Sequence, residues 1–431
     1  MLPMRHSLLS IPLIAVMSLA LNGCVKENCQ SVTKAKIYTP VYMALSDVRA
    51  TAVQTMPARD IAKTGKIYTR GNYILVSEPA KGIHIIDNSQ PSSPRKVSFL
   101  NVMGNADMAV QDNILYADSF RDLLVFDISD LSNIRFLKRF DDVMGYVVDD
   151  MGRWLGTPSA QRDSILVGYS ERDTTYAHGC KDTKGDDFVE FDNQMLFFAS
   201  SSFKASSGGG TGKGGSMARF AITKGHLYTV DRYQLTSYNI ATPSDPVKAP
   251  TPVPVGGGIE TIFPYQDYLY IGSTSAMFIY DLVDPEKPAR RSVAIHVNAC
   301  DPIVVEGTTA YVTVRTGNFC AGTVNELQVY DVKDVDRPVK LATYQMSNPH
   351  GLGIDNGKLF ICEGGHGLRF LNAPSPANIT IASTQTGLNA YDVIPFPGEK
   401  RLLVSAVEGI YQYDYSSMTN PVLLSRIEVK K

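Results

Sequence analysis

A segment of two short hydrophobic runs recurs seven times along this chain, and the repetition constrains the fold more than any other feature. One copy is ILYADSFRDLLVFDIS, residues 114–129, in which two runs rich in branched and aromatic residues flank a polar turn. Such runs are typical of β-strands. The other copies begin at Tyr73, His226, Tyr268, Ala310, Lys358 and Arg401.

The spacing of the copies predicts a ring of blades. Alignment on the repeated segments gives a leading residue for the first strand of each unit: Lys66, Asp107, Arg219, Glu260, Asp301, His350 and Asp392. Four of the spacings between them are 41 or 42 residues, one is 49, and one is 112, so a single insertion follows the second unit. One four-stranded sheet cannot bury both of its faces, whereas a ring of seven can. We therefore expect an all-β, seven-bladed β-propeller of four-stranded blades.

This alignment divides the chain into five parts. They are a signal peptide (1–23), an N-terminal tether (24–58), blades 1 and 2 (59–143), an insertion with a Gly/Ser-rich loop (144–217) and blades 3 to 7 (218–431). Residues 41–56 are expected to add a strand beside the last blade and so close the ring. Residues 206–216, SSGGGTGKGGS, are expected to form a flexible linker or a binding loop.

Segments such as LLVFDIS and LQVYDVK, each followed by a turn rich in Asp, Asn and Pro, resemble the LVIVD repeat. Over Val41 to Lys431 the sequence is similar to LVIVD-repeat lipoproteins of Bacteroidetes type. The resemblance implies blades of the LVIVD type, a propeller fold and a lipid-anchored location. It implies no biochemical activity. The Asp, Asn and Pro residues themselves are interpreted as structural, because they form tight turns.

The N-terminus predicts export. Arg5 and His6 precede an apolar stretch, Leu8 to Leu21, that is too short to span a membrane comfortably. Leu21-Asn22-Gly23-Cys24 resembles a bacterial lipobox, so Cys24 is expected to carry the lipid. The alternative is a plain secretory signal with a coincidental cysteine. Val25, in place of Asp, favours the outer membrane, and we therefore expect a lipid-anchored protein of the cell envelope.

The remaining cysteines lie in an exported chain, where disulfides can form. Cys300 and Cys320 fall within one repeat and are the first candidates for a pair. The cysteine and histidine spacings show no zinc motif.

The leading residues of the first strands are expected to line one mouth of the propeller channel. With Arg315 from a flanking loop they form the candidate ligand site: Lys66, Asp107, Arg219, Glu260, Asp301, His350, Asp392 and Arg315. The arginines can hold a carboxylate or sulfate, and the aspartates can hold Ca²⁺, the one cofactor considered. The alternative is that strand starts simply favour polar residues, which then bridge neighbouring blades through water.

Function is weighed among three classes. A net charge of −2 gives no electrostatic footprint for nucleic acid. The favoured class is a non-enzymatic binding or interaction module that meets a glycan or an envelope protein. An alternative is a carbohydrate-active hydrolase or lyase that uses acids at the channel mouth. The absence of sialidase-type Asp boxes and the single Trp disfavour an enzyme. The third class is a structural envelope protein without a small ligand.

Overall fold

The structure is a computed structural model that describes residues 30–51, 53–148, 153–159, 163–179, 213–216, 218–295, 302–315 and 324–430. The chain divides into two compact units. The smaller comprises residues 1–40 and 169–192, and the larger comprises residues 41–168 and 193–431. The signal peptide, Cys24, Asp301 and the Cys300–Cys320 pair predicted above lie outside the described residues.

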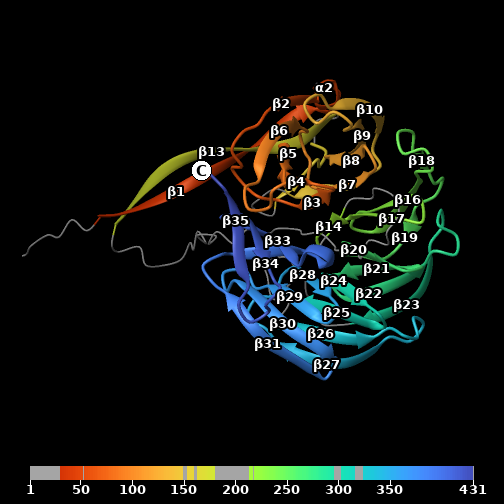
Figure 1. Cartoon of the computed structure of the whole chain (residues 1–431). Helices are drawn as coiled ribbons and strands as arrows, with labels where there is room; N and C mark the ends of the chain where they lie inside the picture. The colour runs from red at the N-terminus through yellow and green to blue at the C-terminus, as the bar shows by residue number, and fades with distance from the viewer. Residues whose placement is uncertain are drawn as a thin grey trace, which may run out of the picture. The chain divides into compact units, whose positions relative to one another are not determined.

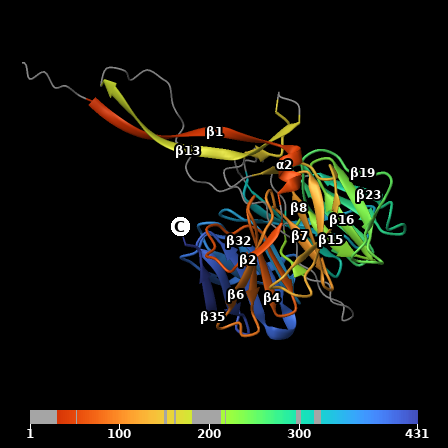
Figure 2. The ribbon, with the colours of Figure 1, turned by 90° about the horizontal axis from the view of Figure 1, so that it is seen from above.

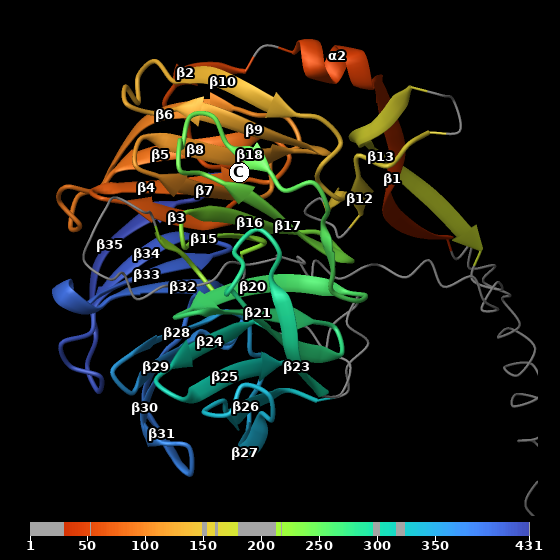
Figure 3. The ribbon, with the colours of Figure 1, turned by 90° about the vertical axis from the view of Figure 1, so that its right-hand side faces the viewer.

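The larger unit is a seven-bladed β-propeller, as predicted. Its blades follow one another in chain order around a ring, from orange through green to blue (Figure 1, Figure 3). The first three are β3–β6 (Ile67–Arg70, Tyr73–Glu78, Gly82–Asp87, Arg95–Asn101), β7–β10 (Met108–Gln111, Ile114–Ser119, Asp122–Asp127, Arg135–Phe140) and β15–β19 (Phe220–Thr223, His226–Val230, Gln234–Asn239, Val247–Lys248, Val253–Pro254).

The other four blades have four strands each. They are β20–β23 (Ile259–Tyr265, Tyr268–Ser273, Ala276–Asp281, Ala289–Ile295), β24–β27 (Ile303–Glu306, Thr309–Val314, Glu326–Asp331, Val339–Gln345), β28–β31 (Leu352–Asp355, Lys358–Cys362, Leu368–Ser375, Asn378–Gln385) and β32–β35 (Ala390–Phe396, Arg401–Ala406, Gly409–Asp414, Val422–Glu428). A short 3₁₀ helix, η1 (Pro397–Glu399), joins β32 to β33.

Burial follows position within each blade. The middle strands are covered by neighbouring blades on both faces, which explains their unbroken apolar runs; every residue of β8 is buried. The outermost strands face solvent on at least one side, and the first three residues of β10 are exposed. The core is therefore continuous around the ring, with one apolar cluster shared by blades 1, 2 and 3 and another by blades 4, 5 and 6.

The ring closes differently from the expectation. The segment 41–56 adds no strand to the last blade, because blade 7 already draws all four of its strands from residues 390–428. The segment instead forms the end of β1, the helix α2 (Leu45–Ala50) and the start of β2 (Gln54–Pro57), which pairs with the outer strand β6 of blade 1. Closure runs through a parallel bridge between Ile61 and Val429.

Side chains strengthen this closure. Thr64 donates a hydrogen bond from Oγ1 to the Ala406 carbonyl over 2.7 Å. Asn88 and Gln412 exchange two amide hydrogen bonds, of 3.0 and 2.7 Å. A cluster of buried apolar residues, including Ile61, Ile74 and Leu403, fills the space between blades 1 and 7. The ends of the propeller are thus joined by packing and hydrogen bonds.

The insertion after blade 2 contributes short elements. β11 (Val147–Val148) pairs with β12 (Trp154–Leu155), and β14 (Lys213–Gly214) pairs with β3. β13 (Ser164–Gly179) forms a two-stranded sheet with β1 (Gln30–Ala44), and the two strands lie side by side in Figures 1 and 2. Most of this ribbon belongs to the smaller unit, where Lys36 Nζ lies 2.8 Å from Glu171 Oε2.

Candidate functional site in the propeller channel

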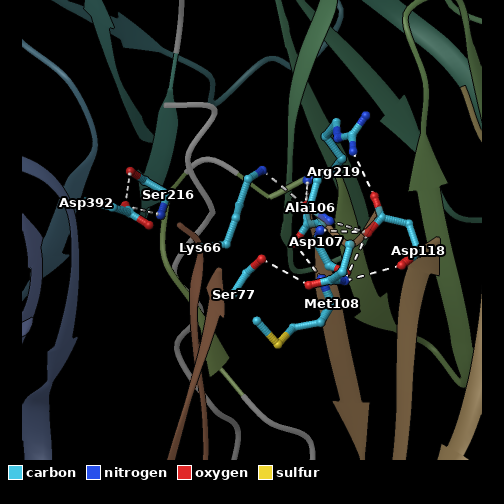
Figure 4. Close-up of polar contacts among 10 residues, drawn as sticks. Lys66, Ser77, Ala106, Asp107, Met108, Asp118, Ser216, Arg219 and Asp392 are labelled. Carbon is cyan, nitrogen blue, oxygen red and sulfur yellow. Dashed lines mark hydrogen bonds and ion pairs between the residues drawn. The ribbon is translucent and has the colours of Figure 1, made fainter. Parts of the chain in front are cut away.

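Blades 1, 2 and 3 are connected by charged residues of the predicted ring. Lys66 precedes β3, and its Nζ lies 3.2 Å from Oδ2 of Asp107, which precedes β7. The same oxygen accepts a 2.6 Å hydrogen bond from the backbone N–H of Arg219, and Asp107 Oδ1 accepts one from Met108 N–H (Figure 4). Lys66 and Asp107 are both buried. The structure therefore brings three ring members together, with Lys66 and Arg219 both donating to Asp107.

Asp118, at the end of β8, completes this group. Its Oδ1 accepts hydrogen bonds from Asn105 Nδ2 and from the backbone N–H groups of Ala106 and Asp107, over 3.0, 2.6 and 2.9 Å. Its Oδ2 lies 3.0 Å from Arg219 Nη2. Burial raises the pKa of Asp118 to about 6, although the Arg219 charge and the backbone donors oppose the rise. Lys66, Asp107, Asp118 and Arg219 thus form a group of paired opposite charges, in which both carboxylates are buried.

A short piece of the insertion lies inside the ring. We call Lys213–Ser216 the strap. Its first two residues are β14, which pairs with Tyr68 and Thr69 on the innermost strand of blade 1. Gly214, Gly215 and Ser216 are buried. The end of the segment 206–216 is therefore an ordered strand and not a flexible linker; residues 206–212 fall outside the described part.

The far end of the strap is held by blades 6 and 7. Asp392 Oδ1 accepts hydrogen bonds from Ser216 N–H and Ser216 Oγ, over 3.0 and 3.2 Å (Figure 4). Ser216 Oγ in turn accepts a 2.6 Å bond from Leu352 N–H. A Cβ on Gly215 would lie 2.0 Å from Asp392 Oδ2, so only glycine fits there. The strap thus occupies the carboxylate that the sequence assigned to ligand binding.

The remaining described ring members are also buried. Glu260, the second residue of β20, is 9% exposed. Arg315 follows β25 and is 6% exposed, and His350 precedes β28 and is 4% exposed. Burial first, and then the Arg315 charge, lower the pKa of His350 well below its ordinary value, so its ring is neutral near pH 7. His350 packs edge-on against Tyr391, with ring centroids 5.1 Å apart.

A second buried charged group lies at blade 1. Glu78 Oε2 is 2.7 Å from His84 Nε2 and 3.1 Å from Arg59 Nη2, and its Oε1 is 3.0 Å from Lys81 Nζ. Burial alone would raise the pKa of Glu78, but these three partners outweigh it and hold the pKa at about 2. The arrangement fits a role in holding the loop after β4 in place.

Two of the predicted calcium ligands, Asp107 and Asp392, have protein partners, and the third, Asp301, lies outside the described residues. Oxygens of Asp107 and Asp392 accept hydrogen bonds from the protein itself. Within the described residues, no group of three His, Cys, Asp or Glu side chains is arranged to hold a metal ion.

Over the same residues, no helix is long and apolar enough to cross a membrane.

Sequence reasoning missed several residues that complete these groups. Ser216 and Asn105 were not predicted as partners of Asp392 and Asp118. Ser216 lies 176 residues from Asp392 in the chain, whereas Asn105 lies only 13 residues from Asp118. Gly364 and Asn348, which lie beside His350, were also missed. Only the strap had a sequence signal, namely the glycine run that ends at Ser216. Glycines allow a segment to lie in a narrow space where larger side chains would clash.

Comparisons with known proteins agree with the fold. The LVIVD repeat family matches residues 62–101 and 104–142, which cover blades 1 and 2. No curated protein matches the sequence. Among solved structures, a functionally unknown protein from Desulfotomaculum acetoxidans is similar, with a TM-score of 0.52 and 9% identity over 83% of this chain and 95% of that one.

Two further structures have lower scores. The computationally designed Ika8 protein gives a TM-score of 0.49 with 9% identity, covering 86% of this chain and 88% of its own. BamB from Moraxella catarrhalis gives 0.46 with 9% identity, covering 87% and 97%. Fold and repeats together define this protein as a seven-bladed β-propeller that carries LVIVD repeats.

Proposed function

We propose that this protein is a lipid-anchored interaction module of the cell envelope, which binds a glycan or a protein and catalyses no reaction. The proposal rests on the burial and the hydrogen bonding of three acidic side chains in the channel. Asp107, Asp118 and Asp392 are at most 2% exposed, and all of them accept hydrogen bonds from the protein. Carboxylates used in this way stabilise a rigid scaffold, and rigid propellers offer wide loop surfaces for binding.

The hydrolase alternative receives no support from this geometry. A glycosidase needs two carboxyl groups that flank the bond to be cleaved, and both must reach the substrate. The Asp107 and Asp118 side chains are instead enclosed with Lys66 and Arg219. We expect the purified full chain to release no reducing ends from a panel of envelope polysaccharides. Release that is lost in Asp107→Asn would contradict the non-enzymatic proposal.

The anchor is tested by metabolic labelling with an alkyne fatty acid. We expect label on the wild-type chain in the outer-membrane fraction and no label on Cys24→Ser. Cys29→Ser is the matched control, because it removes a thiol five residues away and should leave the label in place. Acyl chains hold a protein firmly to a bilayer, so the Cys24→Ser chain should leave the membrane fraction. Label that persists in Cys24→Ser would refute the anchor.

A further inference from the structure

The ribbon of β1 and β13 is a sheet of only two strands. β1 has 15 residues and β13 has 16, and no third strand pairs with them among the described residues. An isolated two-stranded sheet is only marginally stable in water. The ion pair between Lys36 and Glu171 adds little to that stability, because the two side chains are 54% and 47% exposed. The ribbon therefore needs a further source of stability.

Two contacts define the direction and the register of this ribbon. At one end, just beyond the strands, Leu45 N–H donates to the Asp163 carbonyl over 2.8 Å. Further along, Ser170 Oγ donates to the Thr39 carbonyl over 3.4 Å. Residue numbers fall along one strand while they rise along the other, so the two strands are antiparallel, as Figure 2 also shows.

The register extends to the other end of the ribbon. In an antiparallel pair, the numbers of facing residues have a constant total. The total is 208 for the first contact and 209 for the second, and this shift of one matches the extra residue in β13. Gln30 and Gly179, where the two strands end, again total 209.

Two cysteines continue this register. Cys29 and Cys180 are the next residues of the sequence, one position outside the described residues, and their numbers also total 209. Facing residues of antiparallel strands have Cα atoms about 4.5–5.5 Å apart. That separation lies within the range of about 4.4–6.8 Å that a disulfide bridges. The register of the ribbon, continued by one residue, therefore pairs these two cysteines.

The other cysteines have different assignments. Cys24 is the proposed site of the lipid, and Cys362 is a free thiol in the core. Burial raises the pKa of the Cys362 thiol well above its usual value, so the reactive thiolate is disfavoured. The pair predicted within one repeat uses two more of the six cysteines. Cys29 and Cys180 are then left for each other.

We propose that Cys29 and Cys180 form a disulfide that holds together the end of the ribbon at Gln30 and Gly179. Each thiol loses its proton and the two sulfur atoms form a bond. The two electrons released reduce a disulfide of an exported thiol oxidoreductase to two thiols, which take up the two protons. The inference rests on the proposed function, because disulfides persist in the cell envelope, whereas the cytosol keeps thiols reduced.

Peptide mapping tests the pair directly. The full chain is purified in detergent from whole cells, alkylated without reductant and digested with trypsin. Digestion yields the peptides 27–34 and 173–181, each with a single cysteine. We expect mass spectrometry to find these two peptides linked, and reduction to separate them. Alkylation of both cysteines before reduction, or a link from either of them to another cysteine, would overturn the pair.

Limited proteolysis tests the effect of the disulfide on the ribbon. Trypsin can cut the ribbon after Lys36 and after Arg172. We expect Cys180→Ser to be cut there about tenfold faster or more than the oxidised wild type, because the strands separate more readily without the cross-link. Reductant should accelerate cutting of the wild type and leave the rate of Cys180→Ser unchanged. Cys362→Ala is the matched control, since it removes a different thiol and keeps the pair. Equal cutting of Cys180→Ser and the oxidised wild type would refute the proposal.

The outcomes also separate this inference from the proposed function. A chain that carries lipid on Cys24 but has free thiols at Cys29 and Cys180 refutes the disulfide alone. A chain that yields the linked peptides but carries no lipid supports the disulfide and refutes the anchor.

Discussion

Aspartates serve two different purposes in this chain, and only one of them can be identified from sequence. Asp87 and Asp127 accept hydrogen bonds from the N–H of the residue two positions later, over 2.9 and 2.8 Å, and so form the predicted turns between strands. Asp107 and Asp392 bind partners 112 and 176 residues away. A local partner leaves a sequence signal, whereas a distant one depends on how the blades are arranged.

The strap yields the first prediction at this scale. Gly215→Ala places a Cβ 2.0 Å from Asp392 Oδ2, so the strap must leave its position. We expect a loss of about 1–3 kcal/mol in the free energy of unfolding, as for other overpacked sites. Trypsin should also cut faster after Lys213, measured by mass spectrometry. Gly398→Ala, which meets nothing within 4 Å, should behave as wild type; equal cleavage of both variants would show that the strap tolerates the methyl group.

Glu78 yields a pH prediction. Its pKa of about 2 lies below the ordinary value of 4.5, so the ionised carboxylate adds stability that is complete above pH 4.5 and is lost as pH falls towards 2. Each pKa unit corresponds to 1.36 kcal/mol, so the loss amounts to about 3 kcal/mol. Urea unfolding from pH 7 to pH 3 should show a shallower loss in Glu78→Gln. The exposed Glu428→Gln is the control and should keep the wild-type slope.

At the scale of elements, the short helix α2 is held to blade 2 mainly by charge. Arg49 donates from Nε and Nη2 to the two carboxylate oxygens of Asp122, over 2.9 and 2.7 Å, and Nη2 also reaches Asp142 over 3.0 Å. The Asp122 side chain is 3% exposed. A helix of six residues is too short to be stable by itself, so these contacts and the buried Val48 determine where it lies.

Arg49→Lys tests this clamp. Lysine cannot make the two parallel hydrogen bonds to Asp122, so we expect a loss of about 1–2 kcal/mol in the free energy of unfolding. Arg95→Lys is the matched control, because Arg95 forms a surface pair with Asp87 and is 79% exposed. Its loss should stay below about 0.5 kcal/mol. Equal losses in the two variants, measured by denaturant titration, would mean that the Arg49 geometry has no special importance.

At the scale of the whole molecule, each blade is continuous in sequence, and the ring depends on the contacts between its ends. β35 pairs with β34, and Val429 then bridges to Ile61, with Lys430 N–H donating to the Ile61 carbonyl over 2.8 Å. Ile427 and Ile61 also share an apolar cluster with residues of blades 1 and 7. Loss of this contact would expose the facing sides of two blades at once.

Deletion of residues 422–431 is therefore expected to abolish cooperative unfolding. The deletion removes β35 and the Ile61 bridge, so blade 7 loses its outer strand and blade 1 loses its link to blade 7. Thermal melting followed by circular dichroism gives the readout, and deletion of Lys431 alone is the control. A truncated chain that still melts in one cooperative transition would show that six blades and a partial seventh suffice.

The sequence by itself determined the number of blades and the single insertion, because each blade is a local unit with a repeated apolar pattern. It also predicted a ring of polar residues at the starts of the first strands. Only the tertiary structure decided which groups their side chains contact. Asp107 and Asp392 were assigned to a ligand, yet Arg219 and the strap occupy their oxygens.

The sequence did not predict these contacts because their partners lie far apart along the chain. The strap, Asp392 and Leu352 are in contact only in the closed ring, and no local sequence pattern predicts that contact. The position of His350 in the chain was predicted by the repeat, whereas its close packing against Gly364 depends on the fold. Sequence periodicity thus determined the scaffold, and contacts between distant segments determined its chemistry.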